Sequence, residues 1–165
     1  MDKRYLLILI IIIVCCINLS IIVNNSDTIG SASAIAGKYV FSIPDGFSLY
    51  ENNGNSATIK NNEDVSIYYE SNLSDSDTYD SRLNFIENKT DYKLLSKGTV
   101  NLENISIDTI YYQINDTYKV AFYFEKDNTS FKIIMSNFNY DTDRNLTLDY
   151  ATYIIQSTRF DYKKG

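Results

Sequence analysis

Hydrophobic and polar positions divide this chain into an apolar N-terminal block and a patterned remainder. The block, residues 6–23, is about 18 uncharged residues, close to the roughly 20 that cross a bilayer core as a helix. Lys3 and Arg4 precede it, and the next positive charge is Lys38. Because positive flanks stay in the cytoplasm, residues 1–23 are predicted to form a signal anchor, a single transmembrane helix. The expected localisation is the cell membrane, with the C-terminal domain outside.

A cleavable signal peptide is the alternative to an anchor. The A-x-A sites Ala32-Ser33-Ala34 and Ala34-Ile35-Ala36 follow the block and resemble signal peptidase sites. The block exceeds the roughly 7–15 apolar residues of a signal peptide, and these sites come late after it, which favours the anchor. Cleavage near Ala34 or Ala36 would produce a secreted protein with the same domain.

Residues 24–37 are small, polar and unpatterned, as in flexible linkers, so the folded domain is expected at residues 38–165. Within it, a strand is predicted at residues 39–43, followed by a Pro44-Asp45-Gly46 turn. A loop is expected at 51–55. Period-two alternation then predicts strands at 57–60 and 65–70, followed later by four long strands at 93–102, 105–114, 118–125 and 130–137. Tight polar connections between the later strands make them an antiparallel meander.

Two segments change to helical periodicity, residues 74–89 and 142–158. Ser74 or Asp75 is the expected cap of the first helix, and Asp141 and Asp143 begin the second, where acidic residues favour the helix dipole.

Calcium binding is the alternative for these acidic residues, at Asp75, Asp77 and Asp80 or at Asp141-x-Asp143-x-Asn145. An EF-hand loop requires Gly at its sixth position and Glu at its twelfth, whereas this chain has Leu146 and Thr152 there. Helix capping is therefore the favoured interpretation, and no metal site is expected.

The order of elements, short strands, helix, meander and helix, predicts an α+β fold, an antiparallel sheet with helices packed on it as an α/β/α sandwich. Two stretches, FSIPDGF at residues 41–47 and YIIQSTRF at 153–160, together with this order, resemble the PsbP/DcrB-like family over about residues 39–160. The resemblance implies a small extracytoplasmic accessory or binding domain. It carries over no catalytic residues.

Composition narrows the chemistry. The 165 residues carry a net charge of −6, which argues against nucleic acid as a partner. There is no His and no Trp. The two cysteines, Cys15 and Cys16, lie inside the apolar block after Ile13-Val14, so they lack the small preceding residues of a lipoprotein site and are interpreted as packing residues. The folded part therefore has no disulfide, thiol nucleophile or imidazole base, and no cofactor is expected.

Eight N-x-[ST] triplets occur, against about three expected by chance. The excess predicts N-glycosylation of an exported protein, and the alternative is Asn-rich turns that happen to contain Ser or Thr. Asn18 lies inside the apolar block. The candidate acceptors are Asn24, Asn72, Asn88, Asn104, Asn115, Asn128 and Asn145.

These features predict a membrane-tethered, non-catalytic domain that binds an envelope protein or a surface ligand. A passive glycosylated surface protein is one alternative, and a hydrolase with paired carboxylates is a second, less favoured one. A bare apolar or Tyr-rich face would favour the binding domain, glycans around the whole surface would favour the passive protein, and a buried carboxylate pair would favour the enzyme.

Overall fold

The computed structural model describes residues 32–162. The predicted transmembrane helix at residues 6–23 and the candidate acceptor Asn24 lie outside the described residues. Within the described range, no helix has the length and hydropathy needed to cross a membrane.

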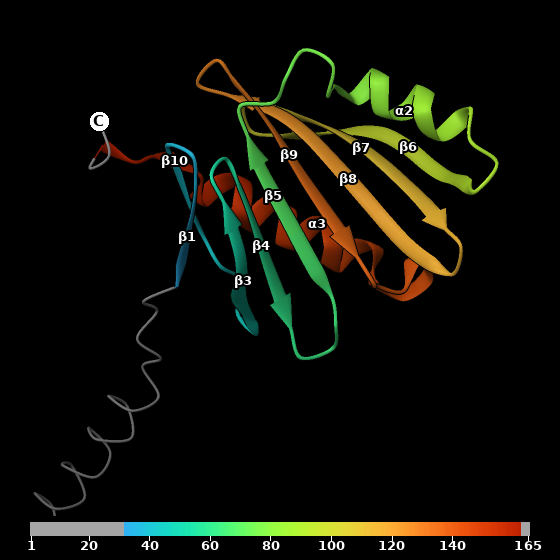
Figure 1. Ribbon diagram of the computed structural model, residues 1–165, viewed down its shortest axis with the longest axis horizontal. Coiled ribbons are helices and arrows are strands. Elements are labelled where there is room, and N and C mark those ends of the chain that lie inside the picture. Colours follow the sequence, from blue (N-terminus) through green and yellow to red (C-terminus); the bar gives the residue numbers. More distant parts are fainter. Residues whose placement is uncertain (1–31, 163–165) are drawn as a thin grey trace, which may run out of the picture. The chain divides into compact units, whose positions relative to one another are not determined.

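Most of the domain is one seven-stranded antiparallel sheet with the order β3-β4-β5-β9-β8-β7-β6 (Figure 1). Its strands are β3 (Phe47–Asn53), β4 (Ser56–Asn61), β5 (Ser66–Ser71), β6 (Tyr92–Leu102), β7 (Ile105–Ile114), β8 (Thr117–Lys126) and β9 (Thr129–Ser136). The predicted four-strand meander is confirmed as β6 to β9. β5 pairs with β9 through residues that lie 60 to 70 positions apart in the chain, and so joins the N-terminal strands to the meander.

Helices cover the two faces of this sheet, which confirms the α/β/α arrangement over the described residues. α3 (Tyr140–Ser157) buries Ala151, Ile154 and Ile155 in the larger core. α2 (Tyr79–Glu87) buries Ile86 in a smaller core on the opposite face (Figure 1). The alternation of the strands supplies both cores, because successive side chains point to opposite faces.

A small sheet of order β1-β2-β10 packs on the same face as α3. It consists of β1 (Ser33–Ala36), β2 (Tyr39–Ser42) and β10 (Arg159–Phe160). Phe41 of β2 stacks on Tyr69 of the main sheet, with ring centroids 4.4 Å apart.

β1 corrects the last part of the predicted linker, because residues 33–36 form a strand; residues 24–31 lie outside the described range. Ala34 and Ala36 are 1% and 0% exposed, and β1 pairs with β2 along its whole length. Small side chains suit both a linker and a closely packed strand, so composition alone could not distinguish them. The compact unit begins at Ala32, before the expected start at Lys38.

Two local predictions were also wrong. The expected loop at 51–55 is mostly strand, since β3 continues to Asn53 and only a tight turn at Gly54 follows. α2 begins later than expected, and Thr78, not Ser74 or Asp75, is its N-cap. The Thr78 and Ser81 side chains each hydrogen bond to the other's backbone N–H, which satisfies two free donors of the first turn.

Candidate functional site

The α2 side of the main sheet is covered over only part of its width. α2 has nine residues and lies along the β6 and β7 end of the sheet (Figure 1). It packs on β6 and β7. The strands β4, β5, β9 and the start of β8 therefore present side chains on this side with no helix above them.

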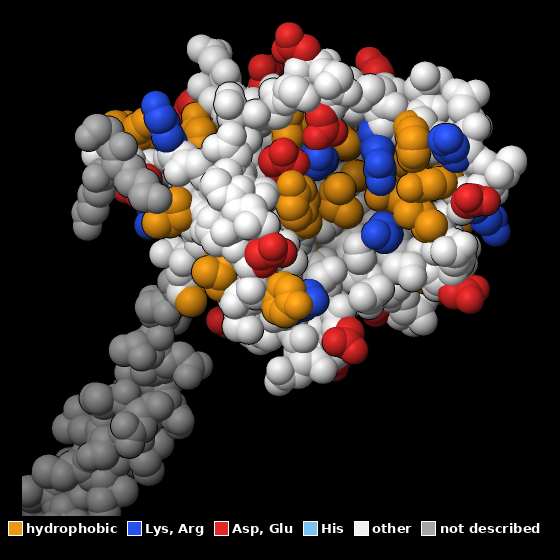
Figure 2. All heavy atoms as spheres, in the orientation of Figure 1, with side chains coloured by type: hydrophobic (Ala, Val, Ile, Leu, Met, Phe, Trp, Pro, Cys, Tyr) orange, Lys and Arg blue, Asp and Glu red, His pale blue; other side chains and the backbone are white. Residues whose placement is uncertain are grey.

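We call this exposed region the open face. Strand register defines its members. Ala121 and Tyr112 lie under α2, and residues that pair with them across neighbouring strands point to the same side of the sheet. One row runs through Thr58, Tyr68 and Ile134 to Ala121, and the next through Lys60, Ser66, Ser136 and Lys119 to Tyr112. In Figure 2, hydrophobic and basic side chains gather across this side, with acidic side chains mostly around them.

A positive charge at the open face rests on an aromatic ring. The Lys60 ammonium is 3.6 Å from the Tyr50 ring centroid. Such a contact between a cation and a ring face is attractive. Tyr50 is 66% exposed, so this contact is at the surface.

Arg82 of α2 borders the open face. It donates from Nη2 to the Tyr112 hydroxyl at 2.8 Å and lies 5.2 Å from the Tyr112 ring centroid. Burial works to lower the pKa of Arg82, but the hydrogen bond to Tyr112 and nearby tyrosines offset this and raise it. Arg82 therefore stays charged. No carboxylate within residues 32–162 forms an ion pair with Lys60, Arg82, Lys89 or Lys119.

A buried ion cluster anchors the loop that leads into α2. The Lys132 ammonium, on central strand β9, donates to Asp77 of that loop and to Glu70 Oε2 of β5, the latter at 3.0 Å. The Lys132 side chain is only 9% exposed. Burial works to lower its pKa, and the hydrogen bonds to Asp77 and Glu70 more than offset this and raise it. The cluster fixes the border between the open face and the covered half of the sheet.

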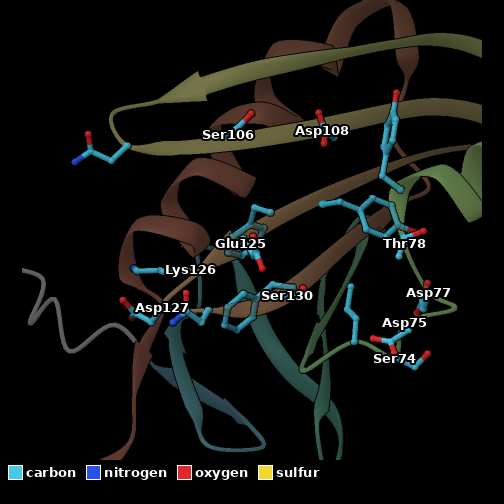
Figure 3. Close-up of a pocket in the computed structure, with 17 residues that line it drawn as sticks. Ser74, Asp75, Asp77, Thr78, Ser106, Asp108, Glu125, Lys126, Asp127 and Ser130 are labelled. Atoms are coloured by element: carbon cyan, nitrogen blue, oxygen red, sulfur yellow. The ribbon is translucent and has the colours of Figure 1, made fainter.

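An acidic cleft of about 720 Å³ lies along this loop, between it and the β6–β7 and β8–β9 hairpins (Figure 3). Its lining includes five carboxylates: Asp75, Asp77, Asp108, Glu125 and Asp127. The one basic residue in the lining, Lys126, donates to the carbonyl oxygens of Ile155 (3.2 Å) and Thr158 (2.5 Å) at the end of α3. Its charge is thus directed to the helix C-terminus.

The carboxylates of the acidic cleft are not arranged like a catalytic pair. None of the five is buried, Asp77 is bound by Lys132, and Asp108 accepts a hydrogen bond from Thr99 at 2.7 Å. A general acid of the glycosidase type needs an environment that raises its pKa, usually burial. Within the described range, no group of three or more acidic or other metal-ligating side chains could hold a metal ion.

The six candidate acceptors that the structure describes, Asn72, Asn88, Asn104, Asn115, Asn128 and Asn145, are all exposed. Asn104 and Asn128 line the acidic cleft, and Asn72 lies next to a residue of its lining. None belongs to the two rows of the open face. Glycosylation itself stays a prediction.

The residues that shape the open face were not singled out from the sequence. Lys132 carried a recognisable sign, because it interrupts an otherwise apolar run of a predicted strand (FKIIM). Arg82 carried none, since an arginine on a short helix is ordinarily a solvated surface residue.

Comparison with known proteins supports the fold. No family model matches this chain, and no curated protein sequence does. Among solved structures, the chain is similar to the cyanobacterial PsbP protein CyanoP of Synechocystis sp. PCC 6803, with 13% identity over 81% of this chain and 95% of that one and a TM-score of 0.52. LpqN of Mycobacterium tuberculosis, involved in cell envelope biogenesis, matches at 10% identity over 82% and 87% of the two chains, with a TM-score of 0.48. A Bacteroides thetaiotaomicron protein matches at 13% identity over 81% and 49%, also with a TM-score of 0.48.

The chain therefore has a PsbP-like α/β/α sandwich fold. This confirms the PsbP/DcrB-like resemblance at the level of the fold. A likeness at this identity carries no activity or partner with it, since unrelated functions share folds.

Proposed function

We propose that this protein is a non-catalytic binding domain, held outside the cell membrane by residues 1–23, which engages a protein partner through the open face. The observation that carries the proposal is the uncovered half of the main sheet. α/β/α sandwiches ordinarily cover both sheet faces with helices, and within residues 32–162 the only helix on this side, α2, packs on β6 and β7.

The composition of the open face suits protein recognition. Tyr68 and Ile134 are half-buried at its centre, and the basic residues Lys60, Lys119 and Arg82 surround them. Interface centres are enriched in Tyr and Arg, which supply contact area at low entropic cost. Of the candidate acceptors that the structure describes, Asn115 borders the open face, since it lines one shallow pocket with Ser66, Lys119 and Ser136. The proposal therefore expects Asn115 to carry no glycan when the partner is bound.

The position of β1 supports an uncleaved anchor. Cleavage near Ala34 or Ala36 would cut through β1, whose side chains at these two positions are buried in the larger core. A mature domain starting there would lose a paired strand and expose apolar surface. Retention of residues 1–23 keeps β1 intact.

The test is photo-crosslinking in intact cells. A photo-reactive amino acid replaces Ser136 in the open face, and the matched control replaces Asp149, an exposed residue of α3 on the opposite side of the sheet. We expect a specific adduct from position 136 only, in the membrane fraction. Equal labelling from both positions, or none, would contradict a binding role for the open face and favour the passive surface protein.

A further inference from the structure

The open face combines two properties that together specify the charge of its partner. The protein as a whole is acidic, with 21 Asp and Glu against 15 Lys and Arg, yet Lys60, Arg82 and Lys119 form no ion pair with any of residues 32–162. Lys132, on the same side of the sheet, is paired with Glu70 and Asp77. Cations without carboxylate partners, in an otherwise acidic protein, form a surface complementary to negative charge.

These cations are also held in place. The Lys60 ammonium lies over Tyr50 at 3.6 Å, and the Arg82 guanidinium is bonded to Tyr112 and stacked near it. Lys119 is half-buried beside Tyr112, its cross-strand neighbour. Side chains that are already ordered lose less entropy when a partner binds.

The spacing of the cations favours an extended partner. Lys60 and Lys119 share one row and are separated by β5 and β9, so their backbones are three strand spacings apart, roughly 14 Å. Four residues of extended chain span about 13 Å. The Ser66 and Ser136 hydroxyls lie between the two lysines in this row, where they can bond a backbone that crosses the strands.

We infer that the open face binds an extended acidic segment of a partner protein, with carboxylates about four residues apart pairing with Lys60 and Lys119. This inference rests on the proposed function and names the partner's chemistry. An anionic lipid surface is the less favoured occupant, because the domain as a whole carries excess negative charge that such a surface repels.

The test measures binding of a fluorescein-labelled peptide to the full-length protein in a neutral detergent. The peptide has a Ser/Thr backbone with Glu at positions i and i+4, and the matched peptide has Gln at both. The protein variants are Lys60→Glu/Lys119→Glu, the neutral Lys60→Gln/Lys119→Gln, and the control Lys93→Glu. Lys93 is exposed, and its register with Gln113 places it on the other side of the sheet.

We expect the Glu peptide to bind at least about ten-fold more tightly than the Gln peptide. Charge reversal at Lys60 and Lys119 should abolish this preference, the neutral pair should reduce it, and Lys93→Glu should leave it unchanged. Unchanged binding in the reversed and neutral pairs would overturn the inference. So would lysine-dependent binding to phosphatidylserine vesicles instead of the peptide, or lysine-dependent self-association through the acidic cleft of a second copy.

The two proposals fail in different ways. If position 136 still crosslinks its partner in cells carrying Lys60→Glu/Lys119→Glu, the binding role stands and the acidic partner is excluded. If position 136 gives no adduct in the unmodified background, the binding role itself fails.

Discussion

Replacing Lys132 by Met is predicted to destabilise the domain substantially. The substitution keeps the length and apolar stem of a side chain that is 9% exposed, but it removes the cation between Glu70 and Asp77. Removal of one member of a buried ion cluster costs about 3–5 kcal/mol. The two carboxylates here are 28% and 34% exposed, so water screens part of this, and about 2 kcal/mol is expected. For a domain of this size that corresponds to a fall in Tm of about 8 °C.

Chemical and thermal unfolding of the full-length protein, followed by circular dichroism, measures this effect. The matched control is Lys97→Met, which breaks the exposed pair with Glu87, whose side chains are 47% and 44% exposed, and should cost less than about 0.5 kcal/mol.

A triple variant separates the charge from the packing of Lys132. Adding Glu70→Gln and Asp77→Asn to Lys132→Met neutralises the two carboxylates that the first change leaves unpaired, and should restore about 1 kcal/mol. The reasoning is refuted if Lys132→Met matches Lys97→Met, or if the triple variant is less stable than Lys132→Met alone.

Three further predictions concern buried groups, and the same unfolding assay checks each. Tyr123→Phe should raise the free energy of unfolding by about 1 kcal/mol, because the buried Tyr123 hydroxyl has no hydrogen-bond partner among the described residues. Tyr112→Phe removes the acceptor of Arg82 and should lower the free energy of unfolding by a similar amount. The same change in free energy from both variants would contradict this prediction. Gly37→Ala should cost about 2 kcal/mol, since φ is +66° and the new Cβ would lie 2.7 Å from Asn55 Oδ1; an unchanged midpoint would show that the turn relaxes. Burial raises the pKa of Tyr69 above its ordinary 10.0, so its contribution to stability is complete below pH 10.0 and is lost as pH rises above it; a flat stability profile between about pH 9 and about pH 11 would disprove this.

The sequence by itself determined the parts of this protein that depend on local periodicity. The meander of β6 to β9 could be predicted because the period-two alternation of a strand, and the turn that follows it, are visible in a short stretch of sequence. α3 could be predicted because Ala151, Ile154 and Ile155 recur at helical spacing behind acidic first-turn residues. Its N-cap is Asn139, and the two aspartates expected at the start, Asp141 and Asp143, lie in its first turn.

Only the tertiary structure decided where a partner has room to bind. The pairing of β5 with β9 and the bond from Lys132 to Asp77, 55 residues apart, join segments whose proximity no local pattern encodes. β1 looked like a linker because Ala and Ser suit a flexible tether as well as a close-packed strand. The open face exists because α2 packs on β6 and β7 and leaves β4, β5 and β9 uncovered on its side. Which strands lie under α2 depends on the number and order of the strands, which are set by long-range pairing and not by the composition of any one segment.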